Sequence, residues 1–498
     1  MSVGSAAPLD DADAIGEIAS RALQQGEEAQ AIPLVQAAAE RLRHPTLWQW
    51  TALLHRSLDE HEAALASFTE AARLAPDDFT IAHGHAHTVM EAGLDAVALF
   101  EHARSLSPRN GPVLIGLAAA EAAVGRGEEG AERLRQGLER APLWVAGHEQ
   151  LAQLLSTLGR ASESTQSLER AIARLPREPA LREALLNLEL LKGRYDRLRD
   201  LVAQTRAASI ETPELAIYEA IHAAEFDTSA RPEALFGRRS RQFDDTLDTW
   251  RVRHLLRVGE PEAALPILDR RLSGPRAAEL WPYAATVWRM TGDPRGQWLV
   301  EQDGLVQVIE LGDALPPLGQ LAEFLRTLHR GRGEYLDQSV RGGTQTDGPL
   351  FSRIDPLIRQ VRAVVVSAVE GYVRRLPPID PGHPLLGRRR DRPVRFSGSW
   401  SVRLQGGGRH SNHVHPQGWI SSALYVSLPE QRLGERDDAG WFTIGDPDER
   451  LGLTIGPRRT IQPLPGRLVL FPSYLWHGTV PFVEGERLTI AFDVRQPA

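Results

Sequence analysis

The feature that most constrains the fold is a proline that recurs at an almost constant interval in the first part of the chain. The intervals are 32, 34 and 34 residues, and the prolines are Pro76, Pro108, Pro142 and Pro176. Upstream of each proline, small and large apolar residues recur at fixed offsets. The small residue lets two helices approach closely, and the large residue four positions later fills the groove between them. Because proline cannot continue a helix, it ends the second one. The spacing therefore predicts stacked helical hairpins.

The residues at these offsets show the pattern directly. They are Ala64, Phe68 and Ala71 before Pro76; Ala96, Phe100 and Ala103 before Pro108; Gly130, Leu134 and Gly137 before Pro142; and Ser164, Leu168 and Ala171 before Pro176. The pattern resembles the tetratricopeptide repeat (TPR), a helix-turn-helix of about 34 residues. The resemblance implies a TPR-like α-solenoid over residues 1–311, whose concave face binds a peptide or a protein partner.

The repeat becomes less regular further along the chain. Ala264 with Leu268 repeats the small-large pair, and Trp281 with Trp288 has the spacing of aromatic positions in the first helix of a repeat. Between about residues 209 and 249 the register cannot be set. We expect six to eight helical hairpins over residues 10–310.

Composition excludes several classes of function. The formal net charge of −8 and the isoelectric point of about 6.1 argue against nucleic acid as a general partner. The absence of cysteine excludes disulfides, thiolate zinc sites and cysteine nucleophiles, so a metal would need nitrogen and oxygen ligands. Neither a signal peptide nor a run of about 20 apolar residues is present. We therefore expect a cytoplasmic protein without a membrane or nucleic-acid partner.

The helical pattern stops near residue 311, and a connector is predicted over residues 312–393. Within it, the polar and glycine-bearing segment 335–346 is predicted to be a loop. The spacing of Ile, Leu and Val over residues 354–375 predicts an amphipathic helix that packs on the outside of a sheet. Residues 377–393 contain several prolines and are predicted to form an extended connector.

From residue 394 to 498 the apolar pattern has a period of two, which predicts strands. The predicted strands cover residues 395–404, 420–428, 440–444, 467–471 and 488–494, and the glycine-rich segment 405–409 is predicted to be a turn. Strands without intervening helices favour a double-stranded β-helix, or jelly roll, with flanking helices. The expected fold class is therefore multidomain α + β.

The β-rich segment contains a candidate metal site. His413 and His415 would point to the same side of an extended backbone, and His477 follows a tight turn about sixty residues later. Three imidazoles from neighbouring strands suit a divalent iron with open coordination positions. This pattern by itself is weak, because histidine pairs on loops are commonly unrelated to metal. Arg487 and Thr489 strengthen it, since a buried arginine beside a hydroxyl can hold a carboxylate through two hydrogen bonds.

These residues together resemble the Fe(II)/2-oxoglutarate-dependent dioxygenases. In that family an arginine, with Ser or Thr two places later, follows the last histidine ligand by about ten residues and binds the distal carboxylate of the cosubstrate. The run from Pro465 to His477 also resembles the approach to that ligand. The resemblance implies Fe(II) and 2-oxoglutarate as cofactors and O2 as cosubstrate, with Arg487 and Thr489 binding 2-oxoglutarate. Tyr425 is either a further hydrogen-bond donor to 2-oxoglutarate or a core tyrosine.

One position departs from the family pattern. The usual first ligand pair is His-x-Asp, whereas this chain has His413-Val414-His415. Either His415 replaces the carboxylate in a three-histidine site, or His415 is itself the first ligand of a two-histidine site and Gln417 stands in the place of the carboxylate. We favour the three-histidine interpretation, with His413, His415 and His477 as metal ligands.

Five neighbouring residues receive other predictions. His410 is predicted to be a solvated loop residue, and Asp493 with Arg495 is predicted to be a surface pair. Trp419 and Trp476 either line the mouth of the barrel or pack in its core.

The resemblance implies an oxygenase that hydroxylates an amino-acid side chain of a peptide or protein recruited by the solenoid. Prolyl and aspartyl hydroxylases that combine helical repeats with the same barrel support this by analogy only. Two alternatives remain open. One is a small-metabolite hydroxylase in which the solenoid serves assembly, and the other is a catalytically silent barrel on a scaffold protein.

Overall fold

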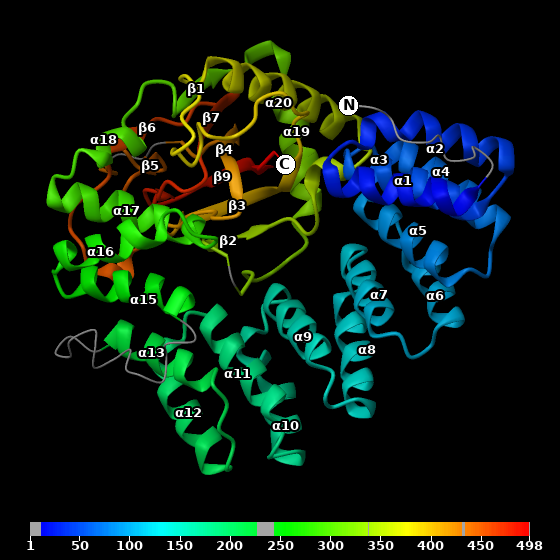
Figure 1. Cartoon of the computed structure of the whole chain (residues 1–498), viewed down its shortest axis with the longest axis horizontal. Coiled ribbons are helices and arrows are strands. Elements are labelled where there is room, and N and C mark those ends of the chain that lie inside the picture. The colour runs from blue at the N-terminus through cyan, green and yellow to red at the C-terminus, as the bar shows by residue number, and fades with distance from the viewer. Residues whose placement is uncertain (1–10, 227–243, 337, 431–433, 498) are drawn as a thin grey trace.

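The computed structural model describes residues 11–226, 244–336, 338–430 and 434–497. A solenoid of helices over residues 12–300 curves around a β-domain over residues 306–497 (Figure 1). The prediction of an all-helical first part followed by antiparallel β-structure is confirmed. Within the part of the chain that the structure describes, no helix is both long and apolar enough to cross a membrane.

The described helices of the solenoid form successive antiparallel hairpins. They are α1 (Ala12–Gln25), α2 (Glu28–Leu42), α3 (Pro45–Ser57), α4 (His61–Leu74), α5 (Phe79–Glu91), α6 (Val97–Leu106), α7 (Gly111–Ala123), α8 (Gly127–Arg140), α9 (Val145–Thr157), α10 (Gln166–Arg174), α11 (Pro179–Leu191), α12 (Leu198–Ala207), α13 (Leu215–Phe226), α15 (Asp244–Arg257), α16 (Pro261–Arg271), α17 (Ala277–Thr291) and α18 (Arg295–Val300). Residues 227–243, within the interval whose register was left open, lie outside the described part.

The recurring residues pack as the repeat predicts. Helices α4, α6, α8 and α10 each end two residues before one of the four prolines. Phe68, Phe100, Leu134 and Leu168 are completely buried. A Cβ atom added to Gly130 would lie 2.7 Å from the backbone oxygen of Ala118 on α7, so a larger residue would push the two helices apart. The small residues of the pattern are therefore required for close packing of the two helices in a hairpin, and the large residues fill the space between them.

The turn inside each of the first six hairpins faces the β-domain. Each turn contains a residue with φ between 59° and 86°, and these residues are Gly26, Asp59, Gly93, Gly125, Gly159 and Gly193. Glycine adopts this left-handed conformation at no steric cost, and it commonly ends helices. The turns are also compact, which lets another part of the chain approach the end of the first helix closely.

Arginines of the β-domain donate hydrogen bonds to the backbone oxygens at these helix ends. Arg395 donates to Gly26 (3.3 Å), Arg362 to Leu58 (3.1 Å), Arg353 to Gly93 (3.3 Å) and Arg330 to Ala123. The backbone N–H of Arg332 donates to Thr157 (2.8 Å). The last carbonyls of a helix lack intrahelical partners and carry the negative end of the helix dipole. The arginines therefore fasten successive repeats of the solenoid to the β-domain.

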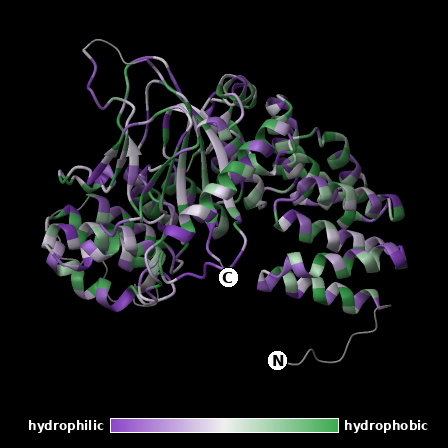
Figure 2. Ribbon diagram, turned by 90° about the horizontal axis from the view of Figure 1, so that it is seen from above, coloured by the Kyte–Doolittle hydropathy of each residue, from purple (hydrophilic) through white to green (hydrophobic). Residues whose placement is uncertain are grey.

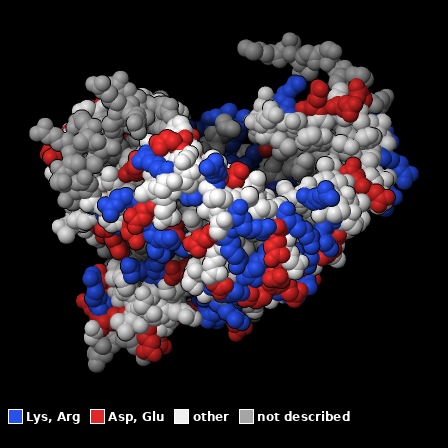
Figure 3. All heavy atoms as spheres, turned by 90° about the horizontal axis from the view of Figure 1, so that it is seen from below, with Lys and Arg blue, Asp and Glu red and all other residues white. Residues whose placement is uncertain are grey.

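Charged side chains of both signs are intermixed on the outer surface. Figure 3 shows Lys and Arg next to Asp and Glu across the face that it draws. Several of the solenoid's surface arginines pair with an acid three residues away on the same helix, as Arg104 does with Glu101 and Arg135 with Glu132. Pairs at this spacing lie one turn apart and stabilise a helix modestly. These pairs therefore stabilise individual helices of the solenoid.

The β-domain contains two antiparallel sheets. Its strands are β1 (Gln307–Glu310), β2 (Val340–Gln345), β3 (Phe396–His410), β4 (Gly418–Ser427), β5 (Phe442–Ile444), β6 (Arg459–Ile461), β7 (Arg467–Pro472), β8 (His477–Thr479) and β9 (Glu486–Arg495). The larger sheet has the order β1-β7-β4-β9-β3-β2, and the smaller one has the order β6-β5-β8. Closure of these sheets into a jelly roll stays a prediction.

Helices cover the outer face of the larger sheet. They are α19 (Leu318–Leu328) and α20 (Pro356–Arg375), and they pack in the same apolar cluster as the central strands. Ile358, Val361, Val365 and Val369 of α20 are completely buried, which confirms the predicted amphipathic helix. Figure 2 shows hydrophobic residues in the strands of the β-domain and interspersed with hydrophilic ones along the helices. The central strand β4 is buried on both faces as a result.

Three predictions for the connector and sheet need correction. Residues 340–345 of the predicted loop form β2, an edge strand whose backbone pairs with β3, so its mostly polar side chains can remain exposed. Residue Asp337 of that segment lies outside the described part. The glycine-rich segment 405–409 belongs to β3, where the register with β2 shifts. Strand β1 pairs with β7 although it precedes the predicted domain start at 312.

The contact between Arg395 and Glu28 provides a test of the docking. The two side chains are 16% and 2% exposed and form an ion pair between the β-domain and the solenoid. Replacing Arg395→Ala leaves a buried carboxylate without its partner. We expect the free energy of unfolding to fall by about 3–5 kcal/mol, measured by urea denaturation.

The matched control is Arg359→Ala, which removes an ion pair with Glu62 between the same two parts of the chain. Both of its side chains are more than half exposed, so we expect a loss of at most about 1 kcal/mol. Equal losses in the two variants would contradict a buried electrostatic docking contact.

Candidate metal centre

Three histidine side chains meet between the two sheets. His413 and His415 lie between β3 and β4, and His477 begins β8. One potential ligand atom from each ring lies within 4.8 Å of the others. His413 and His477 also exchange backbone hydrogen bonds of 3.0 Å in both directions. The structure thus brings together the three residues that the sequence separates by about sixty positions.

Backbone carbonyls determine the orientation of two of the rings. Nδ1 of His413 lies 2.8 Å from the oxygen of Ser411, and Nδ1 of His477 lies 2.9 Å from the oxygen of Leu475. A carbonyl only accepts hydrogen bonds, so Nδ1 carries the proton and Nε2 keeps its lone pair. Burial lowers the pKa of His413 to about 3 and that of His477 well below its usual range. Both rings are therefore in the neutral form that binds metal.

His415 has a different partner, the carboxylate of Asp493. Its Nδ1 lies 2.6 Å from Oδ2 of Asp493, whose other oxygen accepts a 2.5 Å hydrogen bond from Ser421. Burial acts to lower the pKa of His415, but the charge and hydrogen bond of Asp493 outweigh it, so this pKa is raised. A carboxylate behind a metal-binding imidazole orients the ring and increases its basicity. Asp493 is suited to that role toward His415.

The prediction that Asp493 and Arg495 form a surface pair is wrong for Asp493, which is buried. Its position on β9 explains this. Alternate residues of a strand face the same side, and Arg487, Thr489, Ala491 and Asp493 all line one cavity. Because Thr489 was predicted to face the site, the alternation of side chains along the strand would also have predicted that Asp493 faces the site.

Arg487 is a buried charge with no acidic partner in the described residues. Its side chain is 2% exposed, and its Nε atom has no hydrogen-bond partner there. Its guanidinium lies 5.1 Å from the ring centre of Tyr425, which is completely buried beside it. Burial lowers the pKa of Arg487, yet arginine stays protonated in proteins. An isolated buried cation is costly, so this position suits an anion that arrives from outside.

Thr489 completes this end of the cavity. It pairs directly with Tyr425 across strands β9 and β4, and its side chain is buried. The predicted carboxylate-binding residues therefore lie in the same cavity as the histidines.

His410 is not the solvated loop residue that the sequence suggested. It lies at the end of β3, lines the cavity, and its ring stacks on His413 with 5.8 Å between ring centres. The hydroxyl of Ser339 lies 3.1 Å from Nδ1 of His410 and 3.1 Å from Nε2 of His413. The prediction failed because β3 extends through the glycine-rich segment. Ser339 belongs to segment 335–346, which was predicted to be a loop, and it was not predicted to lie beside the histidines.

The two tryptophans take different positions. Both are buried, and Nε1 of Trp419 donates to the oxygen of Leu385 while Nε1 of Trp476 donates to that of Pro282. Trp419 packs in the core of the β-domain. Trp476 also belongs to this core, and it lines the large groove that opens beside the histidines.

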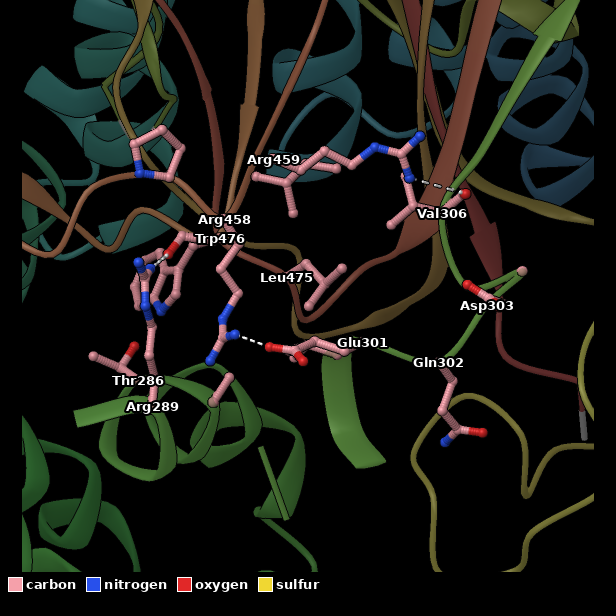
Figure 4. A pocket seen from close by; sticks show the side chains of 16 residues that line it. Thr286, Arg289, Glu301, Gln302, Asp303, Val306, Arg458, Arg459, Leu475 and Trp476 are labelled. Atoms are coloured by element: carbon pink, nitrogen blue, oxygen red, sulfur yellow. Dashed lines mark hydrogen bonds and ion pairs between the residues drawn. The ribbon is translucent and has the colours of Figure 1, made fainter. Parts of the chain in front are cut away.

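A second cavity of about 560 Å³ lies on the other side of Leu475 and Trp476 (Figure 4). Its arginines already have partners. Arg289 donates to the backbone oxygens of Gly445, Ile455 and Gly456, and Arg458 pairs with Glu301. Since the N–H of Gly445 donates to the oxygen of Trp476, these contacts connect α17 to the segment just before His477.

Comparisons with known proteins agree with this geometry. Residues 398–493 match the family model described as "Putative 2OG-Fe(II) oxygenase". The matched interval contains the three histidines and Arg487, Thr489 and Asp493. The matched segment lies within the β-domain, which follows the solenoid of helical hairpins, and it is similar to this family of putative oxygenases. A search of curated proteins finds no match.

Solved structures resemble about a third of the chain. A MamA fragment from Desulfovibrio magneticus RS-1 is 15% identical, with 34% of this chain and 97% of that chain covered and a TM-score of 0.29. YrrB, described as a TPR protein with an unusual peptide-binding site, is 14% identical, with 35% and 92% covered and a TM-score of 0.28. A thermophilic TPR protein of Thermus thermophilus is 17% identical, with 35% and 97% covered and a TM-score of 0.27.

Asp493→Asn tests the importance of the carboxylate behind His415. The amide keeps the shape of the side chain but removes its charge, so the imidazole becomes a weaker ligand. We expect the affinity for Fe(II) to fall by about 10- to 100-fold, measured by anaerobic titration calorimetry. Asp391→Asn, which changes an exposed carboxylate paired with Arg389, should leave the affinity unchanged. An unchanged affinity in folded Asp493→Asn protein would show that the carboxylate has no influence on the metal.

Proposed function

We propose that the protein is an Fe(II)/2-oxoglutarate-dependent dioxygenase that hydroxylates an amino-acid side chain of a peptide or protein. The observation that carries this proposal is Arg487, a buried guanidinium with no acidic partner among the described residues, in one cavity with three clustered histidines. The histidine cluster can bind a metal, and the Arg487 guanidinium can bind a carboxylate. The two together suit a cosubstrate that coordinates the metal at one end and pairs with Arg487 through a carboxylate at the other. 2-Oxoglutarate has this form, with a 2-oxo acid at one end and a second carboxylate at the other.

The donor set suits Fe(II). His413, His415 and His477 would hold the metal through imidazole nitrogens, which bind iron well and leave coordination positions open. In place of a carboxylate ligand, Asp493 adds negative charge from behind His415. When bound, Fe(II) with 2-oxoglutarate and O2 supplies the oxidising chemistry needed to hydroxylate a C–H bond.

The other residues of the cavity bind and orient the cosubstrate. The planar guanidinium of Arg487 can form two parallel hydrogen bonds to a carboxylate, and Thr489 adds a hydroxyl beside it. Tyr425 is not among the residues that line this cavity, and its ring lies 5.1 Å from the guanidinium carbon of Arg487, so it packs behind that side chain. Because these groups are buried, water competes weakly for the carboxylate, which strengthens its attraction to Arg487.

The form of the groove supports a polypeptide substrate. The groove of about 930 Å³ runs from His413 and His415 to residues 190–195 of the solenoid. Its volume is near the upper end of the roughly 300–1,000 Å³ of small-molecule pockets. A compact metabolite would leave most of it unfilled, whereas a peptide could extend from the metal centre to the solenoid.

The test is an anaerobic titration of the full chain with Fe(II) and 2-oxoglutarate, followed by the visible metal-to-ligand charge-transfer band. We expect a band in the wild type, no band in His477→Ala, and a weakened affinity for 2-oxoglutarate in Arg487→Ala. The loss in Arg487→Ala should be at least about 2 kcal/mol, or roughly 30-fold, because a buried charge partner is removed.

Arg374→Ala is the control, since this arginine of α20 is 70% exposed and lies outside the cavity. It should retain the wild-type band. If the folded wild-type protein shows no band, the oxygenase proposal fails and the silent-barrel alternative is favoured.

A further inference from the structure

The groove beside the metal centre is built from both parts of the chain. The solenoid contributes residues 190–195 at the end of α11, and the β-domain contributes β2, the start of β3 and residues 411–418. His413 and His415 also line it. A molecule that reaches the histidines through this groove therefore also meets the solenoid.

Two arginines lie side by side on the groove. Arg341 of β2 and Arg409 of β3 are directly opposite each other in the antiparallel register, and both line the groove. Their side chains are 47% and 37% exposed. Like charges at opposed positions destabilise a strand pair. A ligand carboxylate between the two arginines would relieve this repulsion.

The nearby carboxylates compensate the pair only weakly. Glu334 lies 3.7 Å from Arg341, and Glu449 lies 3.4 Å from Arg409. Both acids are exposed, and exposed ion pairs contribute little to stability. A ligand carboxylate can therefore displace them at small cost.

The remaining charges on the groove have closer partners. Asp448 pairs with Arg253 and Arg450, each at 3.0 Å, and Asp493 pairs with His415. Lys192 donates to the hydroxyl of Ser164. Arg341 also donates to the backbone oxygens of Gln338 (2.6 Å) and Val340 (2.7 Å), but these acceptors are neutral. Arg341 and Arg409 are therefore the arginines of the groove that have no carboxylate within 3.0 Å.

The solenoid side of the groove offers apolar contacts. Leu191 at the end of α11 is 45% exposed, and Tyr195 and Leu336 lie along the same groove. Successive side chains of an extended peptide point to opposite sides. Such a peptide can place an apolar side chain toward Leu191 while a neighbouring carboxylate meets the arginines.

We propose that the groove recognises an extended polypeptide segment that carries aspartate or glutamate close to the residue delivered to the metal centre. Arg341 and Arg409 hold the acidic side chain, and Leu191 contacts an apolar one. This proposal rests on the proposed oxygenase function and adds the class of its substrate.

The experiment uses the full chain with Fe(II) and 2-oxoglutarate under anaerobic conditions. The probes are two fluorescein-labelled degenerate decapeptide pools that differ only in having glutamate or lysine at alternate positions, and binding is followed by fluorescence anisotropy. We expect the glutamate pool to bind at least tenfold more tightly than the lysine pool. The double variant Arg341→Glu/Arg409→Glu should lose this preference, while Arg374→Glu should keep it. Leu191→Ser should weaken binding of the glutamate pool severalfold.

The charge-transfer band of the same samples separates the two proposals. If the double variant keeps the band but loses the preference for glutamate, the groove proposal is supported. If the wild type shows no preference, or the double variant keeps it, the groove proposal is overturned, and an intact band leaves the oxygenase proposal standing. If the wild type lacks the band, the oxygenase proposal fails, and the anisotropy alone decides what the groove binds.

Discussion

The contact between helix ends of the solenoid and arginines of the β-domain organises the whole molecule. Each first helix of a hairpin ends with carbonyls that have no partner within the helix, and Arg395, Arg362 and Arg353 donate to three of these ends. The solenoid is therefore docked along one edge of its repeats, rather than attached by a single linker. A truncation at residue 311 would expose these arginines and the apolar surface beside them, so loss of activity in such a variant would not identify the solenoid as a recruitment arm.

The candidate metal centre depends on a second electrostatic arrangement. The potential ligands His413, His415 and His477 include no carboxylate. The nearby negative charge is on Asp493, which is hydrogen-bonded to the Nδ1 atom of His415. At the other end of the cavity, Arg487 is a buried cation with no acidic partner in the described part of the chain. The cavity therefore combines imidazole ligands with an unsatisfied positive charge. This combination favours a ligand that brings its own negative charge, as a 2-oxo dicarboxylate does.

The position of the groove changes the role expected of the solenoid. The sequence predicted that the concave face of the solenoid binds a peptide or a protein partner. Leu190, Leu191, Lys192, Gly193 and Tyr195 of the solenoid line the groove that opens at His413 and His415. The solenoid can thus contact a substrate within a few residues of the reacting position, where it would influence which segment fits.

The sequence by itself determined the features that repeat locally. The spacing of four prolines predicted the hairpins, the period of two predicted the main strands, and the motif around His413, His477 and Arg487 predicted the site, because each pattern follows from the geometry of a helix or a strand. Only the tertiary structure decided that Asp493 and Ser339 lie beside the histidines, that residues 340–345 form an edge strand, and that arginines join the two parts. These features depend on residues far apart in the chain. Which residues come into contact is determined by how the sheets and helices pack. A local sequence pattern contains no information about these contacts.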